Sequence, residues 1–242
     1  LDEIAVFKHG KKASITFNAL PKDKSYAQKE GYTFFMEKEI YEQGTVVSET
    51  IMGRVKNHKV TLENLDDEYL KGIDDVVLCA CGTSYHAALV ASYLFERLAK
   101  VRTKVEVASE FRYRKPYLNK NSLFIVISQS GETADTLEAL RIAKEAGLKT
   151  LAICNVDNSS IVRLADNTLL TRAGIEKGVA STKAFATQII VLWMLVLQMA
   201  SAKGSISKKE LDHEIKTLLH IPQILNIDNS LQEKLHRLSK HY

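Results

Sequence analysis

Three continuous apolar runs, each followed by a polar turn, constrain the fold of this chain more than any other feature. They span Val76–Ala80, Leu123–Ile127 and Thr150–Cys154, and shorter candidates lie at Val105–Val107 and Thr168–Thr171. An uninterrupted apolar strand suits a position that is buried on both faces, as in a parallel sheet. We therefore predict a parallel sheet of about five strands.

Helical patterns separate these runs, at Ser84–Lys100, Ala134–Ala146 and Ser160–Leu164. Alternating strands and helices imply βαβ units with right-handed crossovers, and hence a three-layer α/β/α sandwich. A long helix is expected from Ser181 to Ala200. Its most apolar part, Ile189–Ala200, is shorter than the ~20 residues of a membrane-spanning helix, so we predict a buried core helix.

Other elements flank the sandwich. A hairpin is expected within residues 4–17, and a polar linker at 18–31 follows it. Two strands alone are marginal in water, so this hairpin needs a neighbour. Tyr32–Gln43 has a helical pattern with Gly44 as its expected stop, and Val46–Val55 reads as a second helix or a turn.

Beyond the long helix, Ser207–Glu210 matches a capping box and opens a helix that runs to about His220. Pro222 is expected to interrupt it, and a further helix is expected from Asn229 to Tyr242. These segments are predicted linker helices.

The net charge, the start of the chain and the cysteine content argue against nucleic-acid, membrane and metal partners. The net charge of +4 comes from 33 basic and 29 acidic residues, which is too mild to argue for nucleic acid. No signal peptide opens the chain, so the cytoplasm is the expected compartment and no membrane partner is expected. The cysteines are odd in number, and the Cys79-x-Cys81 pair lacks the further ligands of a zinc site, so no metal is expected.

Two hydroxyl-rich turns stand where strands of the predicted sheet end. Residues 81–84 follow the first apolar run and residues 128–133 follow the second, and each turn leads into a helix. Ligands bind beyond the carboxyl ends of parallel strands, where helix N-termini offer free N–H groups and a positive dipole. Gly82 and Gly131 permit close approach of the backbone. The combination suits a phosphate.

Ser128 and Ser130 could instead cap the helix that follows, because serine is among the best N-cap residues. One such turn alone would favour capping, whereas two at successive strand ends favour a shared ligand. Neither turn matches the Walker A or the dinucleotide-binding glycine pattern, and no cofactor is expected.

A third candidate segment, residues 178–185, precedes the long helix. Ser181 is the expected N-cap with a free hydroxyl, and the backbone of Val179 and Ala180 could face a ligand. We expect Lys183 to be an exposed helix lysine rather than an anion contact.

The run Ser-Gln-Ser-Gly-Glu-Thr-Ala-Asp-Thr-Leu at 128–137 resembles the signature of the sugar-isomerase (SIS) domain. Four further segments extend the likeness: Cys-Gly-Thr-Ser at 81–84, Ser-Glu-Phe-Arg-Tyr-Arg at 109–114, Ile-Cys-Asn-Val at 153–156 and Gly-Val-Ala-Ser-Thr-Lys at 178–183. Together they resemble the glutamine–fructose-6-phosphate aminotransferase (isomerizing) family, also called glucosamine-6-phosphate synthases. The resemblance runs from about residue 30 to residue 200.

That family carries a glutaminase domain followed by two SIS domains, and converts fructose 6-phosphate and glutamine to glucosamine 6-phosphate and glutamate. The resemblance implies four parts in this chain. They are the tail of a missing glutaminase domain (1–24), a linker with a helix (25–65), the first SIS domain (66–203) and a helical connector to a missing second SIS domain (204–242). The Leu1 start then reads as an excision point.

The resemblance also implies a homodimer and a hexose 6-phosphate ligand, either fructose 6-phosphate or glucosamine 6-phosphate. The turn at 128–133 would hold the phosphate, and the remaining groups would address the sugar hydroxyls or the carbonyl end. The implied contacts come from Thr83, Ser84, Ser128, Gln129, Ser130, Thr133, Val179, Ala180 and Ser181.

No catalytic residue can be assigned here. The glutaminase cysteine and the family's base glutamate, ring-opening histidine and C-terminal lysine have no counterpart, so the chain alone is expected to be inactive. Glu132 is expected to complement a helix dipole rather than to act as a base, and His86 to be structural. The alternatives are a stand-alone SIS aldose–ketose isomerase and a sugar-phosphate-sensing module.

Overall fold

The apolar runs form one sheet, as predicted. The structure is a computed structural model that describes residues 5–13 and 28–241. Every strand pair in the sheet is parallel, and the spatial order is β6-β5-β7-β8-β9. The strands are β5 (Asp75–Ala80), β6 (Arg102–Val107), β7 (Ser122–Ser128), β8 (Lys149–Cys154) and β9 (Asn167–Leu170).

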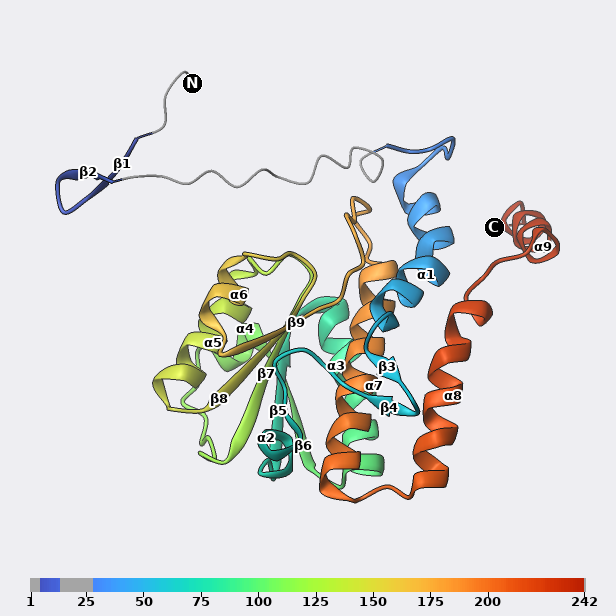
Figure 1. The fold of residues 1–242 in the computed structure, drawn as a ribbon. Coiled ribbons are helices and arrows are strands. Elements are labelled where there is room, and N and C mark those ends of the chain that lie inside the picture. The colour runs from blue at the N-terminus through green and yellow to red at the C-terminus, as the bar shows by residue number, and fades with distance from the viewer. Residues whose placement is uncertain (1–4, 14–27, 242) are drawn as a thin grey trace.

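Helices cover both faces of this sheet and complete the three-layer sandwich (Figure 1). Alternate strand residues point to opposite faces, so Leu78 and Ile125 lie in one apolar core and Cys79 and Val126 in the other. The first core contains α3 (Gly82–Leu94), its π-helical continuation η2 (Phe95–Ala99) and α7 (Lys183–Lys203). The second contains α4 (Ala108–Phe111), α5 (Ala134–Glu145) and α6 (Ser160–Leu164).

The long apolar helix α7 is the centre of the larger core. It is long and apolar enough to cross a membrane, but 72% of its most apolar window is buried inside the protein. Leu192, Leu195 and Met199 are completely buried. The expected core helix is therefore present.

Two helices from outside the sandwich, α1 (Phe35–Ile51) and α8 (Lys208–Ile224), pack against α7 and against each other (Figure 1). The expected stop at Gly44 is wrong, because α1 continues through it. A Cβ at Gly44 would lie 2.8 Å from the Pro222 carbonyl oxygen, so the glycine lets α8 approach closely. Pro222 does not interrupt α8 either, since it occupies the last turn of the helix.

The hydroxyl of Ser207 accepts the Glu210 N–H at 3.2 Å, which confirms the predicted cap of α8. Four small elements were not predicted, because each is only two to five residues long. They are β3 (Val55–Lys56), β4 (Lys59–Val60), α2 (Asp67–Lys71) and the short helix α4. The last helix is α9 (Asn229–Ser239).

The N-terminal hairpin is present as β1 (Val6–Lys8) and β2 (Lys11–Ala13), which pair antiparallel. His9 and Gly10 between them both have positive φ, as a type I′ turn requires. Residues 5–12 are all exposed, so no described part of the chain supplies the expected neighbour. The rest of the predicted hairpin and most of the linker lie outside the described residues.

Candidate functional site

The two hydroxyl-rich turns flank the point where the strand order reverses. From β5 the chain crosses to β6 on one side, and then returns to place β7 on the other side of β5. The helix that follows β5, α3, and the helix that follows β7, α5, cover opposite faces of the sheet (Figure 1). In open parallel sheets the ligand crevice lies at this switch point, outside the carboxyl ends of the strands.

In the turn after β7, the serines hold the loop rather than cap the helix. The Ser128 hydroxyl accepts the Gly131 N–H at 3.0 Å and lies 3.3 Å from the Thr133 hydroxyl. The Ser130 hydroxyl accepts the Glu132 N–H at 3.2 Å. Thr133 is the N-cap of α5, and no side chain caps that helix. The first N–H groups of α5 are thus available to an anion.

The helix after β5 begins in the same way. Cys81 is the N-cap of α3 and makes no side-chain capping bond, Thr83 is exposed and Ser84 is 8% exposed. Elsewhere the N-cap side chain bonds the helix start in α2, α8 and α9, through Asp66, Ser207 and Asp228, whereas in α1 and α4 it makes no such bond. The position of α3 and α5 at the switch point, together with their open starts, makes their N-termini candidates for binding a ligand.

Position 131 requires a glycine for two reasons, its backbone conformation and the lack of space for a side chain. Its φ is +68°, and a Cβ there would collide with Ser159 and lie 2.8 Å from Cys154 Sγ. Its carbonyl oxygen accepts the Ile161 N–H at 3.0 Å. The turn is thereby packed onto the start of α6.

Glu132, the carboxylate in this turn, faces a different helix from the one expected. Its Oε1 accepts the Ser160 N–H of α6 at 2.8 Å, and this bond lowers the pKa of the Glu132 carboxyl. The group is thus held ionised at the start of α6 rather than α5. His86 is exposed on α3, where its ring makes an edge contact with Tyr85 at 5.6 Å.

Asn155 fixes the chain between β9 and the third segment. Sequence analysis placed this residue in a motif but gave it no role. The Asn155 side chain donates to the Gly174 carbonyl at 2.6 Å and accepts the Ala173 N–H at 2.8 Å. It also accepts the Thr171 hydroxyl at 3.0 Å. A lone asparagine after a strand gives no sequence signal for such a role.

Ser181 is not the N-cap of α7, as was expected; that position belongs to Thr182. Glu176 takes over the capping, because its Oε1 accepts the N–H groups of Thr182 at 2.9 Å and Ala184 at 3.1 Å. The Ser181 hydroxyl lies 3.4 Å from Glu176 Oε2. A carboxylate thus already occupies the N-terminus of this helix.

Val179 and Ala180 are exposed beyond this cap. Their segment lies at the carboxyl end of the sheet, because it leads from the end of β9 to the start of α7. Among the described residues, no hydrogen bond joins Val179–Ser181 to either hydroxyl-rich turn. The structure therefore places the two turns at neighbouring strand ends. The third segment lies at the same end of the sheet, but among the described residues it makes no hydrogen bond to either turn.

Lys183 is buried, which corrects the expectation of an exposed lysine. Its side chain is 1% exposed, and Nζ lies 2.7 Å from Glu42 Oε2. Glu42 belongs to α1, far earlier in the chain, so local sequence could not indicate this partner.

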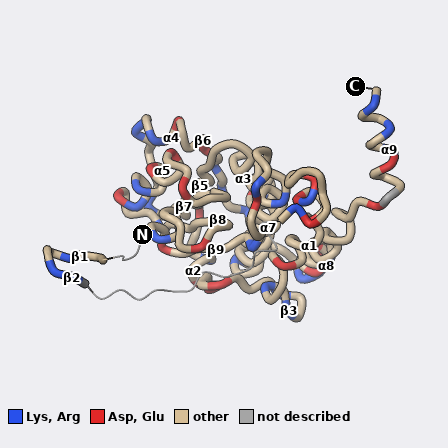
Figure 2. Tube along the Cα trace, turned by 90° about the horizontal axis from the view of Figure 1, so that it is seen from above, with Lys and Arg blue, Asp and Glu red and all other residues tan. Residues whose placement is uncertain are grey.

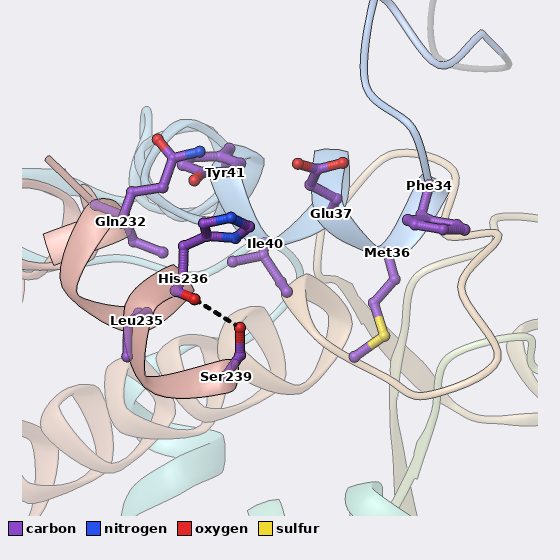
Figure 3. Close-up of a pocket in the computed structure, with 10 residues that line it drawn as sticks. Phe34, Met36, Glu37, Ile40, Tyr41, Gln232, Leu235, His236 and Ser239 are labelled. Carbon is purple, nitrogen blue, oxygen red and sulfur yellow. Dashed lines mark hydrogen bonds between the residues drawn. The ribbon is translucent and has the colours of Figure 1, made fainter. Parts of the chain in front are cut away.

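Basic and acidic residues are interspersed over the chain (Figure 2). Neither hydroxyl-rich turn contains a lysine or an arginine, so the donors that the turns themselves offer are hydroxyls and backbone N–H groups. A separate groove of about 630 Å³ lies between α1 and α9 (Figure 3). Its wall is largely apolar, with Phe34, Met36, Ile40 and Leu235, and it includes no residue of the two turns.

Comparison with known proteins shows which proteins this chain is similar to. The SIS domain matches residues 69–198. The glutamine–fructose-6-phosphate aminotransferase (isomerizing) of Campylobacter jejuni is 60% identical over 241 residues, which is 100% of this chain and 40% of that protein. The Helicobacter pylori protein of the same name is 47% identical over 220 residues, 91% of this chain and 36% of that one.

A solved structure is also similar to this chain. The C-terminal domain of the glucosamine-fructose-6-phosphate aminotransferase from Francisella tularensis superposes with a TM-score of 0.78 at 44% identity. The match covers 81% of this chain and 56% of that one. This chain thus spans well under half the length of the two curated relatives.

Proposed function

The chain belongs to the SIS-domain family, and on that premise we propose that it is the sugar-phosphate-binding part of the isomerase half of a glucosamine-6-phosphate synthase. Both relatives are named glutamine–fructose-6-phosphate aminotransferase (isomerizing). The whole protein would accordingly convert fructose 6-phosphate and glutamine to glucosamine 6-phosphate and glutamate. Residues 66–203 would form the first SIS domain, between a glutaminase tail with its linker (1–65) and a connector (204–242).

The observation that carries this proposal is the pair of uncapped helices at the switch point. Both α3 and α5 begin without a side-chain cap, next to hydroxyls of the two turns. Free N–H groups, a helix dipole and hydroxyl donors together favour a phosphate dianion. The buried hydroxyl of Thr136, in the first turn of α5, has no partner among the described residues, which adds a polar group to this end of the helix.

We assign the phosphate to the turn formed by residues 128–133. The sugar end would be addressed by the turn after β5 and by the exposed segment before α7. The full set of proposed contacts is Thr83, Ser84, Ser128, Gln129, Ser130, Thr133, Val179, Ala180 and Ser181.

The proposal includes no catalytic residue in this chain. Glu132 is engaged at the start of α6, which disfavours its use as the base of a stand-alone isomerase. We therefore propose that the catalytic groups lie in parts of the protein outside this chain. As the resemblance implies, we also propose that the protein is a cytoplasmic homodimer.

Calorimetric titration with fructose 6-phosphate tests the function, with unphosphorylated fructose as the control. We expect saturable binding of the phosphorylated sugar only. At a ligand concentration 100 times Kd, the protein should gain about 2.7 kcal/mol of stability against unfolding. Absence of saturable binding would contradict the proposal, and glucosamine 6-phosphate formation by these 242 residues alone would contradict the assigned lack of catalysis.

A further inference from the structure

Helix α1 lies outside the segment that matches the SIS domain, yet it contacts the loop before α7. Glu39 of α1 is 3% exposed. Its carboxylate accepts the N–H of Lys177, and both of its oxygens lie 3.1 Å from the Gly178 nitrogen. The carboxylate therefore fixes the direction of two successive peptide groups.

A second carboxylate fixes the other end of the same loop. Glu176 accepts the N–H groups of Thr182 and Ala184. Residues 179–181 form the short span between these two anchored ends, and within it Val179 and Ala180 are exposed. The backbone offered to a ligand is thus set by side chains that lie behind it.

The contact at Gly178 leaves no space for a side chain. A Cβ there would lie 2.5 Å from Glu39 Oε2. Glycine is needed at this position for close approach rather than for an unusual φ. The same helix is tied to the start of α7 by the ion pair between Glu42 and Lys183. Helix α1 and the loop therefore form one packed unit.

We propose that Glu39 is a positioning residue that shapes the backbone of residues 179–181 for the sugar end of the ligand. This inference rests on the proposed function. The expected effect is confined to the sugar end of the ligand, because no hydrogen bond among the described residues joins α1 to the turn at 128–133. Loss of the Glu39 contact should therefore weaken recognition of the sugar and leave recognition of the phosphate intact.

Calorimetric titration of the 242-residue chain with fructose 6-phosphate and with inorganic phosphate tests this claim. The Glu39→Gln substitution keeps the side-chain shape but removes the charge and one acceptor. We expect about tenfold weaker binding of fructose 6-phosphate, the size of effect that follows loss of a hydrogen bond to a charged group, and unchanged binding of phosphate. The matched control is Glu49→Gln, on the same helix, which should change neither.

Gly178→Ala disturbs the same contact from the loop side and keeps the test informative if Glu39→Gln folds poorly. It should reproduce the selective loss of sugar affinity. Equal binding of fructose 6-phosphate by wild type and both variants would overturn the inference alone, as would an equal loss for both probes. Failure of the wild-type chain to bind fructose 6-phosphate would overturn the proposed function and, with it, this inference.

Discussion

The ammonium group of Lys183 lies 2.7 Å from Glu42 Oε2, and this ion pair joins the start of α7 to α1. The lysine side chain is 1% exposed, whereas that of Glu42 is 22% exposed. Glu42 also lies 3.5 Å from Lys38 Nζ, which is buried as well. One carboxylate thus serves two buried cations, and removing one partner of a buried pair costs more than the pair contributes.

Glu42→Gln should therefore destabilise the protein more than Lys183→Met does. We expect a loss of about 3 kcal/mol in the free energy of unfolding for Glu42→Gln, because it takes the carboxylate from both lysines. Urea unfolding of the single and double variants measures this. The double variant should lose less than the sum of the two single losses. Additive losses would mean that the two charges do not interact.

Ser128→Ala should weaken hexose 6-phosphate binding. It removes the acceptor of the Gly131 N–H and one hydroxyl of the phosphate turn. We expect about a tenfold increase in Kd for fructose 6-phosphate by calorimetry. Ser122→Ala is the matched control, because Ser122 is equally buried at the opposite end of β7. Equal effects of the two substitutions would argue against a phosphate site in this turn.

Gly131→Ala should be strongly destabilising, since it adds a clash with Ser159 and Cys154 to an unfavourable φ. Gly147→Ala provides the comparison, because Gly147 has φ +77° and open space around its Cβ position. We expect about 1 kcal/mol for Gly147→Ala and about 3 kcal/mol or more for Gly131→Ala. Thermal unfolding distinguishes them, and similar losses would show that the turn can relax away from α6.

Gly44→Ala should destabilise, although alanine is the better helix former by about 1 kcal/mol. Its Cβ would press on Asn226 and the Pro222 carbonyl, which forces α8 away from α1. We expect a net loss of about 1–3 kcal/mol. Ser48→Ala, on the exposed surface of α1, should be neutral or slightly stabilising. A stabilising Gly44→Ala would mean that the two helices are not in close contact in solution.

Asp166 should contribute an acid-sensitive part of the stability. Burial alone would raise the pKa of its carboxyl, but hydrogen bonds from Lys144 and Thr150 outweigh burial and lower it. A folded-state pKa below the unfolded value of about 3.9 stabilises the fold above that pH, and this contribution is lost as pH falls through the folded pKa.

Asp166→Asn should therefore reduce the loss of stability on acidification below about pH 4, by about 1 kcal/mol or less because the group is partly exposed. Urea unfolding at neutral and acid pH measures the difference. Asp74→Asn, at an exposed position, is the control. An unchanged pH dependence for Asp166→Asn would contradict the role given to its hydrogen bonds.

The sheet and the positions of the two hydroxyl-rich turns could be predicted because their signals are local. A continuous apolar run such as Val76–Ala80 can be recognised without knowledge of its neighbours, and so can a hydroxyl-rich turn directly after it. The order of the strands then places the two turns together. The nine proposed contacts remain predictions.

The predictions that were wrong, at Gly44, Lys183 and Ser181, share one cause. Gly44 lies inside α1, where the absence of a side chain allows the close approach of Pro222, and Lys183 is buried because α1 covers it. Ser181 loses the N-cap position because Glu176 folds back on the helix start. In each case a contact between distant or looped segments outweighs a local preference, and one sequence carries no signal for such pairs.

The separation between Glu42 and Lys183 also has a consequence during synthesis. The two residues are 141 positions apart. At about 5–20 residues per second, α1 leaves the ribosome roughly 7–30 s before its partner helix is made. For that time its apolar side has no α7 to cover it, and the early strands must find their order without it. The loop shaped by α1 is therefore among the last parts of the domain to take its final form.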